Sequence, residues 1–226
     1  MLQTGPIIFR FRGLLGVPVE IGQTLAFLIL LFVGLSLSAG GDLVWLTAVI
    51  AMILSAIYLH ELGHAWASLV QGVPVRRIVL HGGGGFCEHA RSASAPQQEF
   101  ITAMGPLVNL ALWAVSSLLA DWTWSTGLGS GMLGHYFWLF ARINIMFFAF
   151  NLIPVQPLDG GKLLQLVLLR FVAPKLAMQI AGAVGLVFAI LWWPALFYLW
   201  YTSGWLLLFI PSIWLHYQMM KGEIRF

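Results

Sequence analysis

Long apolar segments separated by short polar stretches dominate the chain. Measured against the roughly 20 apolar residues that a helix needs to cross the hydrocarbon core of a bilayer, they predict about six membrane-spanning helices. The pattern therefore predicts an all-α membrane protein, organised as a single transmembrane domain over residues 1–226. The predicted spans cover residues 22–38, 43–70, 99–120, 133–153, 176–198 and 202–219.

The composition supports a membrane environment. The chain is 60% hydrophobic and 8% charged, whereas a soluble domain carries roughly 25% charged residues. A soluble fold of this size cannot bury so much apolar surface, so the bilayer must be the solvent. We therefore expect a multi-pass protein whose partners include the lipid bilayer and no nucleic acid. A bacterial or archaeal cell membrane is expected from its size and simplicity, with an organelle as the alternative.

The basic residues give the predicted bundle an orientation. With six spans, ten of the eleven Lys and Arg residues fall on one side, while the opposite loops contain Asp42 and Asp121 and no Lys or Arg. This positive-inside pattern predicts that both termini are cytoplasmic. Arg142 is the exception because it lies within the fourth predicted span. We expect it to donate structural hydrogen bonds to backbone carbonyls rather than to act in catalysis.

One motif places metal-binding chemistry inside the second predicted span. His60-Glu61-Leu62-Gly63-His64 has the form H-E-x-x-H. On a helix the two histidines lie one turn apart on the same face, so both can reach one metal ion. Glu61 beside them can take a proton from water. Such groups in an apolar helix predict hydrolysis within the membrane, with one Zn²⁺ per chain as the cofactor.

A catalytic zinc site usually needs a third protein ligand, and Asp159 is the best candidate. It follows the fourth predicted span, in a segment where Pro154 and Pro157 prevent a regular helix. Irregular backbone at membrane depth survives only where protein or a water-filled cavity covers it, which is the setting that a buried metal site requires. Glu88 and Glu99 are the other candidates, but they lie in or beside the loop after the second span.

The polar stretch after the second predicted span allows two interpretations. Val75, Ile78, Val79 and Leu80 favour a strand, and the glycines at 82–85 favour a turn. Residues 74–88 then form a short cytoplasmic-side hairpin whose free edge pairs with an extended substrate. An ordinary connecting loop fits the sequence equally well. The stretch also offers side chains for a second metal, although polar loops often hold such residues without binding anything: His81, Cys87, Glu88 and His89.

Three segments resemble the site-2 protease family of intramembrane zinc metalloproteases. They are His60–His64, the sequence NLIPVQPLDGG at 151–161, and Gly-Pro-Leu-Val-Asn at 105–109. The first two together are highly specific, and the third supports them weakly. The resemblance assigns residues of about 43–153, with the Asp159 segment, to the common core of the family. The remaining predicted spans match only in number and hydropathy.

The resemblance also implies roles for single residues. His60, His64 and Asp159 would be the zinc ligands, and Glu61 the general base and acid. Asn151 matches a polar residue that helps to hold the substrate or to stabilise the oxyanion. Members of the family cleave membrane-anchored proteins within or next to a transmembrane helix, in regulated intramembrane proteolysis. We expect a short form without the extra regulatory domain of many members, and no oligomeric state is predicted.

A membrane transporter for zinc or another ion is the main alternative. Intramembrane His, Asp and Arg residues often mark ion pathways, and a carrier can use His60, His64 and Asp159 as ligands. However, no inverted repeat is evident, and a carrier has no particular need for Glu61. An inactive relative that binds membrane proteins is a further alternative, against which the intact Glu61 argues. The sequence therefore favours hydrolysis of peptide bonds over transport.

Overall fold

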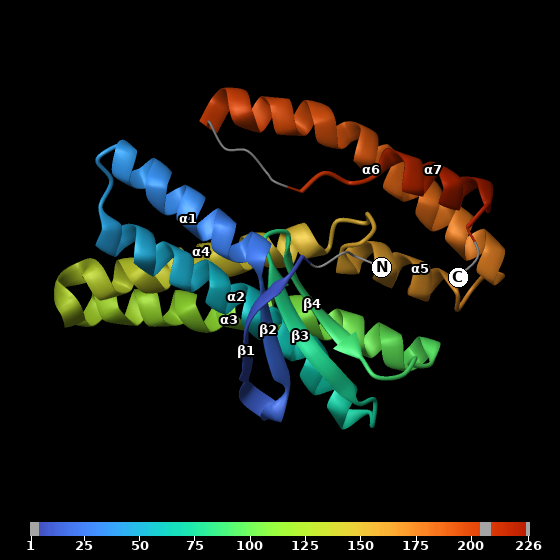
Figure 1. The fold of residues 1–226 in the computed structure, drawn as a ribbon, viewed down its shortest axis with the longest axis horizontal. Coiled ribbons are helices and arrows are strands. Elements are labelled where there is room, and N and C mark those ends of the chain that lie inside the picture. Colours follow the sequence, from blue (N-terminus) through green and yellow to red (C-terminus); the bar gives the residue numbers. More distant parts are fainter. Residues whose placement is uncertain (1–4, 204–208, 225–226) are drawn as a thin grey trace. The chain divides into compact units, whose positions relative to one another are not determined.

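The computed structural model describes residues 5–203 and 209–224. The chain forms two compact units, Met1–Ala93 with Met104–Phe148 and Ser94–Ala103 with Ala149–Phe226. Figure 1 traces the elements in chain order. They are β1 (Ile7–Arg12), β2 (Pro18–Gly22), α1 (Gln23–Ser38), α2 (Leu43–Val70), β3 (Val75–His81), β4 (Gly84–His89), α3 (Ala95–Thr126), α4 (Met132–Asn151), α5 (Asp159–Leu168), α6 (Pro174–Ser203) and α7 (Ile213–Lys221). The expected single domain over residues 1–226 stays a prediction.

Four of the described helices are long and apolar enough to cross a membrane, namely α2, α3, α4 and most of α6. They agree with four of the predicted spans, whereas α1 is a shorter apolar helix. The predicted span at 202–219 includes residues 204–208, which lie outside the described residues. The part that is described contains the last two residues of α6 and most of α7, whose nine residues are too short to cross about 30 Å of hydrocarbon. The predicted count of six spans is therefore not confirmed.

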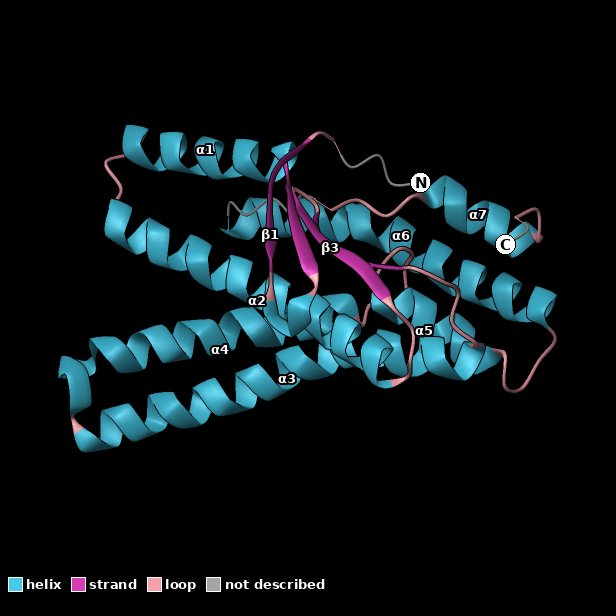
Figure 2. Cartoon of the chain, turned by 60° about the horizontal axis from the view of Figure 1, so that its bottom comes forward, coloured by secondary structure: helices cyan, strands magenta, loops and turns pink. Residues whose placement is uncertain are grey.

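The chain is mostly helical, as expected of an all-α membrane protein, but the first unit also contains a four-stranded sheet, of which only the second hairpin was anticipated. The strand order is β1-β2-β3-β4. The two outer pairs are antiparallel hairpins, and β2 pairs with β3 in parallel. Figure 2 shows these strands in magenta among the cyan helices. The predicted hairpin after α2 is present as β3 and β4, but β3 has partners on both sides, so the free edges belong to β1 and β4.

One face of the sheet packs against α2. Val19 of β2 and Ile78 of β3 are fully buried with Ala65 of α2, and Leu62 packs against the same cluster. Alternate side chains of a strand point to opposite faces, so the apolar residues of β2 and β3 cover the C-terminal half of α2. At its start, α2 is capped by the Asp42 carboxylate, which accepts hydrogen bonds from two backbone N–H groups. The sheet therefore rests on the half of α2 that carries the H-E-x-x-H motif.

A row of charged residues crosses the sheet between strands. Glu20 of β2 is only 1% exposed, and its carboxylate pairs with Arg10 of β1 and Arg77 of β3. Arg77 also pairs with Glu88 of β4, at 2.6 Å. This pairing holds the pKa of the Glu88 carboxyl below its ordinary value, mainly through the hydrogen bond from Arg77. Basic residues on which the predicted orientation rests thus also join the strands of the sheet.

Arg142 takes a different contact from the one expected. It is exposed on α4, and its guanidinium lies 5.5 Å from the centre of the Trp138 ring. These residues are four positions apart and therefore lie on the same helix face. A cation–π contact thus takes the place of the predicted hydrogen bonds to backbone carbonyls.

The central position of β3 predicts the effect of a proline. Val79 is fully buried and lies opposite Glu20 of β2 and Phe86 of β4. Val79→Pro removes a backbone donor from a strand that is paired on both sides. We expect the free energy of unfolding, measured by denaturation in detergent, to fall by about 1–3 kcal/mol. Ile8→Pro is the control, because Ile8 lies at the bulge of edge strand β1, where proline is tolerated. Equal stability of the two variants would contradict the observed strand order.

Candidate metal centre

The H-E-x-x-H motif lies on a buried face of α2. His60, Glu61 and His64 are 6%, 5% and 7% exposed. The Nε2 atoms of the two histidines lie 3.1 Å apart, and their rings are nearly perpendicular at 86°. This is the arrangement expected for residues one helical turn apart. Both Nε2 atoms therefore converge on one point beside the helix.

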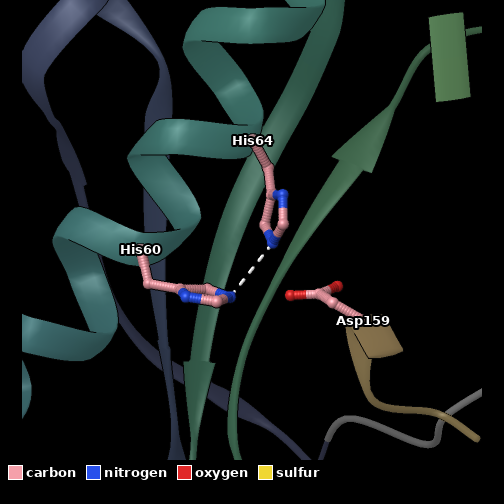
Figure 3. A group of neighbouring side chains, drawn as sticks. All are labelled: His60, His64 and Asp159. Carbon is pink, nitrogen blue, oxygen red and sulfur yellow. Dashed lines mark hydrogen bonds between the residues drawn. The ribbon is translucent and has the colours of Figure 1, made fainter. Parts of the chain in front are cut away.

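Asp159 joins the two histidines in one group of candidate metal ligands. It is the first residue of α5 and is 6% exposed. One ligand atom from each of His60, His64 and Asp159 lies within 4.8 Å of the others. In Figure 3 the Asp159 carboxylate points toward the imidazoles of both histidines. Two imidazole nitrogens and one carboxylate oxygen form a donor set that suits Zn²⁺ and leaves a fourth position open.

Two glycines provide the space that the motif residues occupy in the first unit. A Cβ at Gly105 of α3 would lie 2.3 Å from His64 Nε2 and 2.7 Å from His60 Nε2. A Cβ at Gly85 of β4 would lie 2.7 Å from Glu61 Cγ. Real Cβ atoms essentially never approach so closely, so any larger residue at either position would displace these side chains. The imidazoles thus lie against the backbone of α3, and the Glu61 side chain lies against edge strand β4.

A hydrogen-bond network that the sequence analysis missed orients His60. His60 Nδ1 lies 2.6 Å from Asn109 Oδ1, while Asn109 Nδ2 donates to Asn144 Oδ1 at 2.9 Å. Because the Asn109 amide nitrogen is used as a donor, its oxygen accepts the proton of His60 Nδ1. This leaves the lone pair on His60 Nε2 for a metal. Asn109 and Asn144 are fully buried. The sequence signal for this network was the presence of two asparagines within apolar spans, because buried polar groups need hydrogen-bond partners.

The other candidate ligands have different contacts. Glu88 pairs with Arg76 and Arg77, and Glu99 pairs with Arg170 at 2.7 Å. Within residues 5–203 and 209–224, the group of His60, His64 and Asp159 is the one set of three that could hold a metal. The structure thus gives no support to Glu88 or Glu99 as third ligand, or to a second site in the hairpin.

Asn151 is the remaining residue for which a role was expected. It is the last residue of α4 and is half-buried. Its expected part in holding the substrate or stabilising the oxyanion stays a prediction.

His81 is a titratable group close enough to Glu61 to feel its charge. Burial lowers the pKa of His81, and the negative charge of Glu61 opposes that shift only in part. Its Nδ1 accepts a hydrogen bond from the Gly83 N–H at 3.0 Å. The neutral imidazole therefore carries its proton on Nε2. His81 is thus a neutral hydrogen-bond donor at neutral pH, at the end of β3.

Comparison with known proteins places these residues in a family. The sequence model of peptidase family M50 matches residues 48–132 and 125–192, which include the H-E-x-x-H motif and Asp159. A zinc metalloprotease of Methanocaldococcus jannaschii is 27% identical over 176 residues, which cover 78% of this chain and 50% of that protein. A relative from Synechocystis sp. is 32% identical over 169 residues, which cover 69% of this chain and 43% of that protein. The chain spans about half the length of these curated relatives.

A solved structure shares the fold. The site-2 protease from Methanocaldococcus jannaschii matches with a TM-score of 0.64 and 22% identity, over 95% of this chain and 92% of that chain. The shared fold therefore covers more of this chain than the residues that match the family model.

The network around His60 predicts that Asn109 supports metal binding. Asn109→Leu removes the acceptor for His60 Nδ1–H, so the imidazole loses its fixed orientation. Loss of such a partner typically weakens metal binding by about 10- to 100-fold, and we expect a loss in that range for zinc, measured by competition with a chelator. Ser116→Ala is the matched control, because Ser116 is a buried polar residue two turns further along α3. Unchanged zinc affinity in a folded Asn109→Leu variant would contradict the proposed orientation of His60.

Proposed function

The chain belongs to peptidase family M50, the site-2 protease family, and on that premise we propose that it is an intramembrane zinc metalloprotease. It hydrolyses peptide bonds within or next to the transmembrane segments of membrane-anchored proteins. The observation that carries this proposal is the convergence of two buried histidines and a buried aspartate, with a buried glutamate next to His60 on the same helix, in an otherwise apolar protein. Such a set is costly at membrane depth, and hydrolysis gives each member a role.

The roles of the ligands follow from their chemistry. We assign His60, His64 and Asp159 to the binding of one zinc ion. When bound, zinc supplies Lewis acidity that activates water and polarises the scissile carbonyl. His60 binds through Nε2 because its Nδ1–H is held by Asn109. Lys162 Nζ lies 3.8 Å from Asp159 Oδ1, so a positive charge stands beside the proposed carboxylate ligand.

Glu61 and Asn151 complete the proposed machinery. Glu61 takes the proton from the attacking water and returns it to the leaving amine, as a general base and then a general acid. Its position against Gly85 restricts the carboxylate. Asn151 donates its side-chain amide to the carbonyl oxygen on which negative charge develops.

The strand edge beside Glu61 is the proposed place for the substrate backbone. A transmembrane helix must unwind before cleavage, because its peptide groups are bonded to one another and shielded. Edge strand β4 can pair with the unwound segment in an extended form. Since Gly85 of β4 contacts the Glu61 side chain, a peptide paired to β4 would run beside the catalytic carboxylate.

The substrate class and orientation follow from the family and the charge pattern. The proposed partners are the lipid bilayer and proteins anchored by a transmembrane helix. Most Lys and Arg residues fall on one predicted side, and we place both termini and the metal centre toward the cytoplasmic side of a prokaryotic membrane. Helix-breaking residues in a substrate would lower the cost of unwinding.

Glu61 distinguishes hydrolysis from transport. Glu61→Gln keeps the size of the side chain but removes the base, so cleavage of a panel of single-span substrates should fall by at least about 100-fold. Zinc content, measured on the same purified samples, should stay at the wild-type level. Glu99→Gln is the matched control, since Glu99 pairs with Arg170 outside the metal centre. Full cleavage by Glu61→Gln would exclude Glu61 from the mechanism, and zinc flux into proteoliposomes with either variant would favour a carrier.

Pairing at β4 predicts a periodic pattern of disulfide cross-links. Cys87 is the only cysteine, so a Cys87→Ser background accepts single cysteines in place of Phe86 on β4 or Phe9 on β1. With substrates that carry a cysteine at successive positions around the cleavage site, cross-links to Phe86→Cys should alternate every second residue. Phe9→Cys should give no such pattern, because β1 is the opposite edge of the sheet. A helical repeat, or equal cross-linking at both edges, would contradict substrate pairing with β4.

A further inference from the structure

His216 of α7 is a fully buried histidine outside the metal centre. Its Nδ1 lies 2.7 Å from the carbonyl oxygen of Ser212. A carbonyl oxygen only accepts, so Nδ1 carries the proton. His216 Nε2 then accepts a hydrogen bond from the backbone N–H of Gln156 at 2.9 Å. The imidazole is therefore neutral, and both of its nitrogens have partners within the second unit.

Helix α6 makes room for this imidazole. A Cβ at Gly185 would lie 2.1 Å from His216 Cδ2 and 2.6 Å from Nε2. One turn earlier, a Cβ at Gly182 would lie 2.5 Å from the backbone nitrogen of Met220. Two glycines on one face of α6 thus let α7 pack closely beside it (Figure 1). The position of His216 is fixed by the backbone of α6 on one side and by the start of α7 on the other.

The Gln156 N–H belongs to the loop that carries Asp159. A Cβ at Gly161 would lie 2.6 Å from the carbonyl oxygen of Val155 and 2.8 Å from the nitrogen of Gln156. The Val155–Gln156 peptide therefore contacts the first turn of α5 and also receives the His216 imidazole. A Cβ at Gly160 would lie 2.2 Å from the Leu152 carbonyl oxygen. Asp159 thus stands next to two glycines that rest directly on the loop backbone.

We propose that His216 is a positioning residue for the metal ligand Asp159. Its Nε2 holds the Val155–Gln156 peptide in place, and this peptide supports the first turn of α5 from which the Asp159 carboxylate projects. The inference rests on the proposed metal site, and it adds a residue of the C-terminal helix to the support of that site. Packing of α7 alone would not require a hydrogen-bond acceptor at this position.

Two substitutions distinguish the role of His216 as a hydrogen-bond acceptor from its role in packing α7 against α6. His216→Gln retains an acceptor oxygen that can reach the Gln156 N–H, whereas His216→Leu fills similar space without one. We expect His216→Leu to bind zinc about tenfold or more weakly, the scale for lost support of a metal ligand, by chelator competition on the full chain. Its cobalt-substituted form should show an altered visible absorption band. His216→Gln should restore both properties, and Met219→Leu, in the core of the same helix, should change neither.

Hydrogen exchange at Gln156 and a second variant test the positioning role independently of zinc affinity in His216→Leu. Hydrogen exchange at the Gln156 amide in the metal-free protein should accelerate in His216→Leu and stay slow in His216→Gln. If His216→Leu does not fold, Gly185→Ala displaces the same ring and should weaken zinc binding likewise. Wild-type zinc affinity, cobalt absorption and Gln156 exchange in His216→Leu would overturn the positioning role while the proposed function stands. A wild-type chain that binds no zinc, with exchange at Gln156 still dependent on His216, would instead overturn the proposed function.

Discussion

A polar centre inside apolar helices requires a hydrogen-bond partner for every buried polar atom around it. The hydrogen bond between His60 and Asn109 is the one on which the rest of the centre depends. In hydrocarbon an unpaired amide or imidazole costs several kcal/mol. Asn109 accepts from His60 and donates to Asn144, and Asn144 in turn donates to the Phe140 carbonyl at 2.9 Å. The network links α2, α3 and α4, so the tautomer of the proposed metal ligand His60 and the packing of three helices depend on the same bonds.

The second requirement is that backbone segments approach closely around the proposed metal centre, and glycines make this approach possible. Gly63 lets α2 approach the Met104 carbonyl of α3, and Gly105 lets α3 lie against both imidazoles. Gly160 and Gly161 do the same for the Asp159 loop within its own unit. In each case a methyl group would push apart atoms that must converge. This explains why small residues, which add nothing to hydrophobic burial, occur at the most buried positions of the chain.

The sequence reveals the candidate ligands more readily than the residues that support them. The H-E-x-x-H spacing and the Asp159 segment are local patterns with a direct chemical meaning, and four apolar spans followed from length alone. Strands β1 and β2 were missed because the basic residues before the first predicted span were used only to orient the bundle, although Phe9 and Phe11 alternate there with Arg10 and Arg12. The parallel pairing of β2 with β3 joins Glu20 to Val79, and no local periodicity reveals such distant contacts. Asn109 was visible as a polar residue in an apolar span, but its partner was not.

His216 shows most clearly why such supports are hard to predict. Its partner Gln156 is 60 residues away in sequence, and nothing in the local pattern of α7 marks the histidine as other than a helical residue. It also lies outside the residues that match the M50 family model, which end at 192, whereas Asn109 lies inside them. The support for His60 thus lies within the matched residues, whereas the support proposed for Asp159 comes from a helix that follows them. The proposed support of Asp159 therefore comes from a part of the chain that follows the residues matched by the family model.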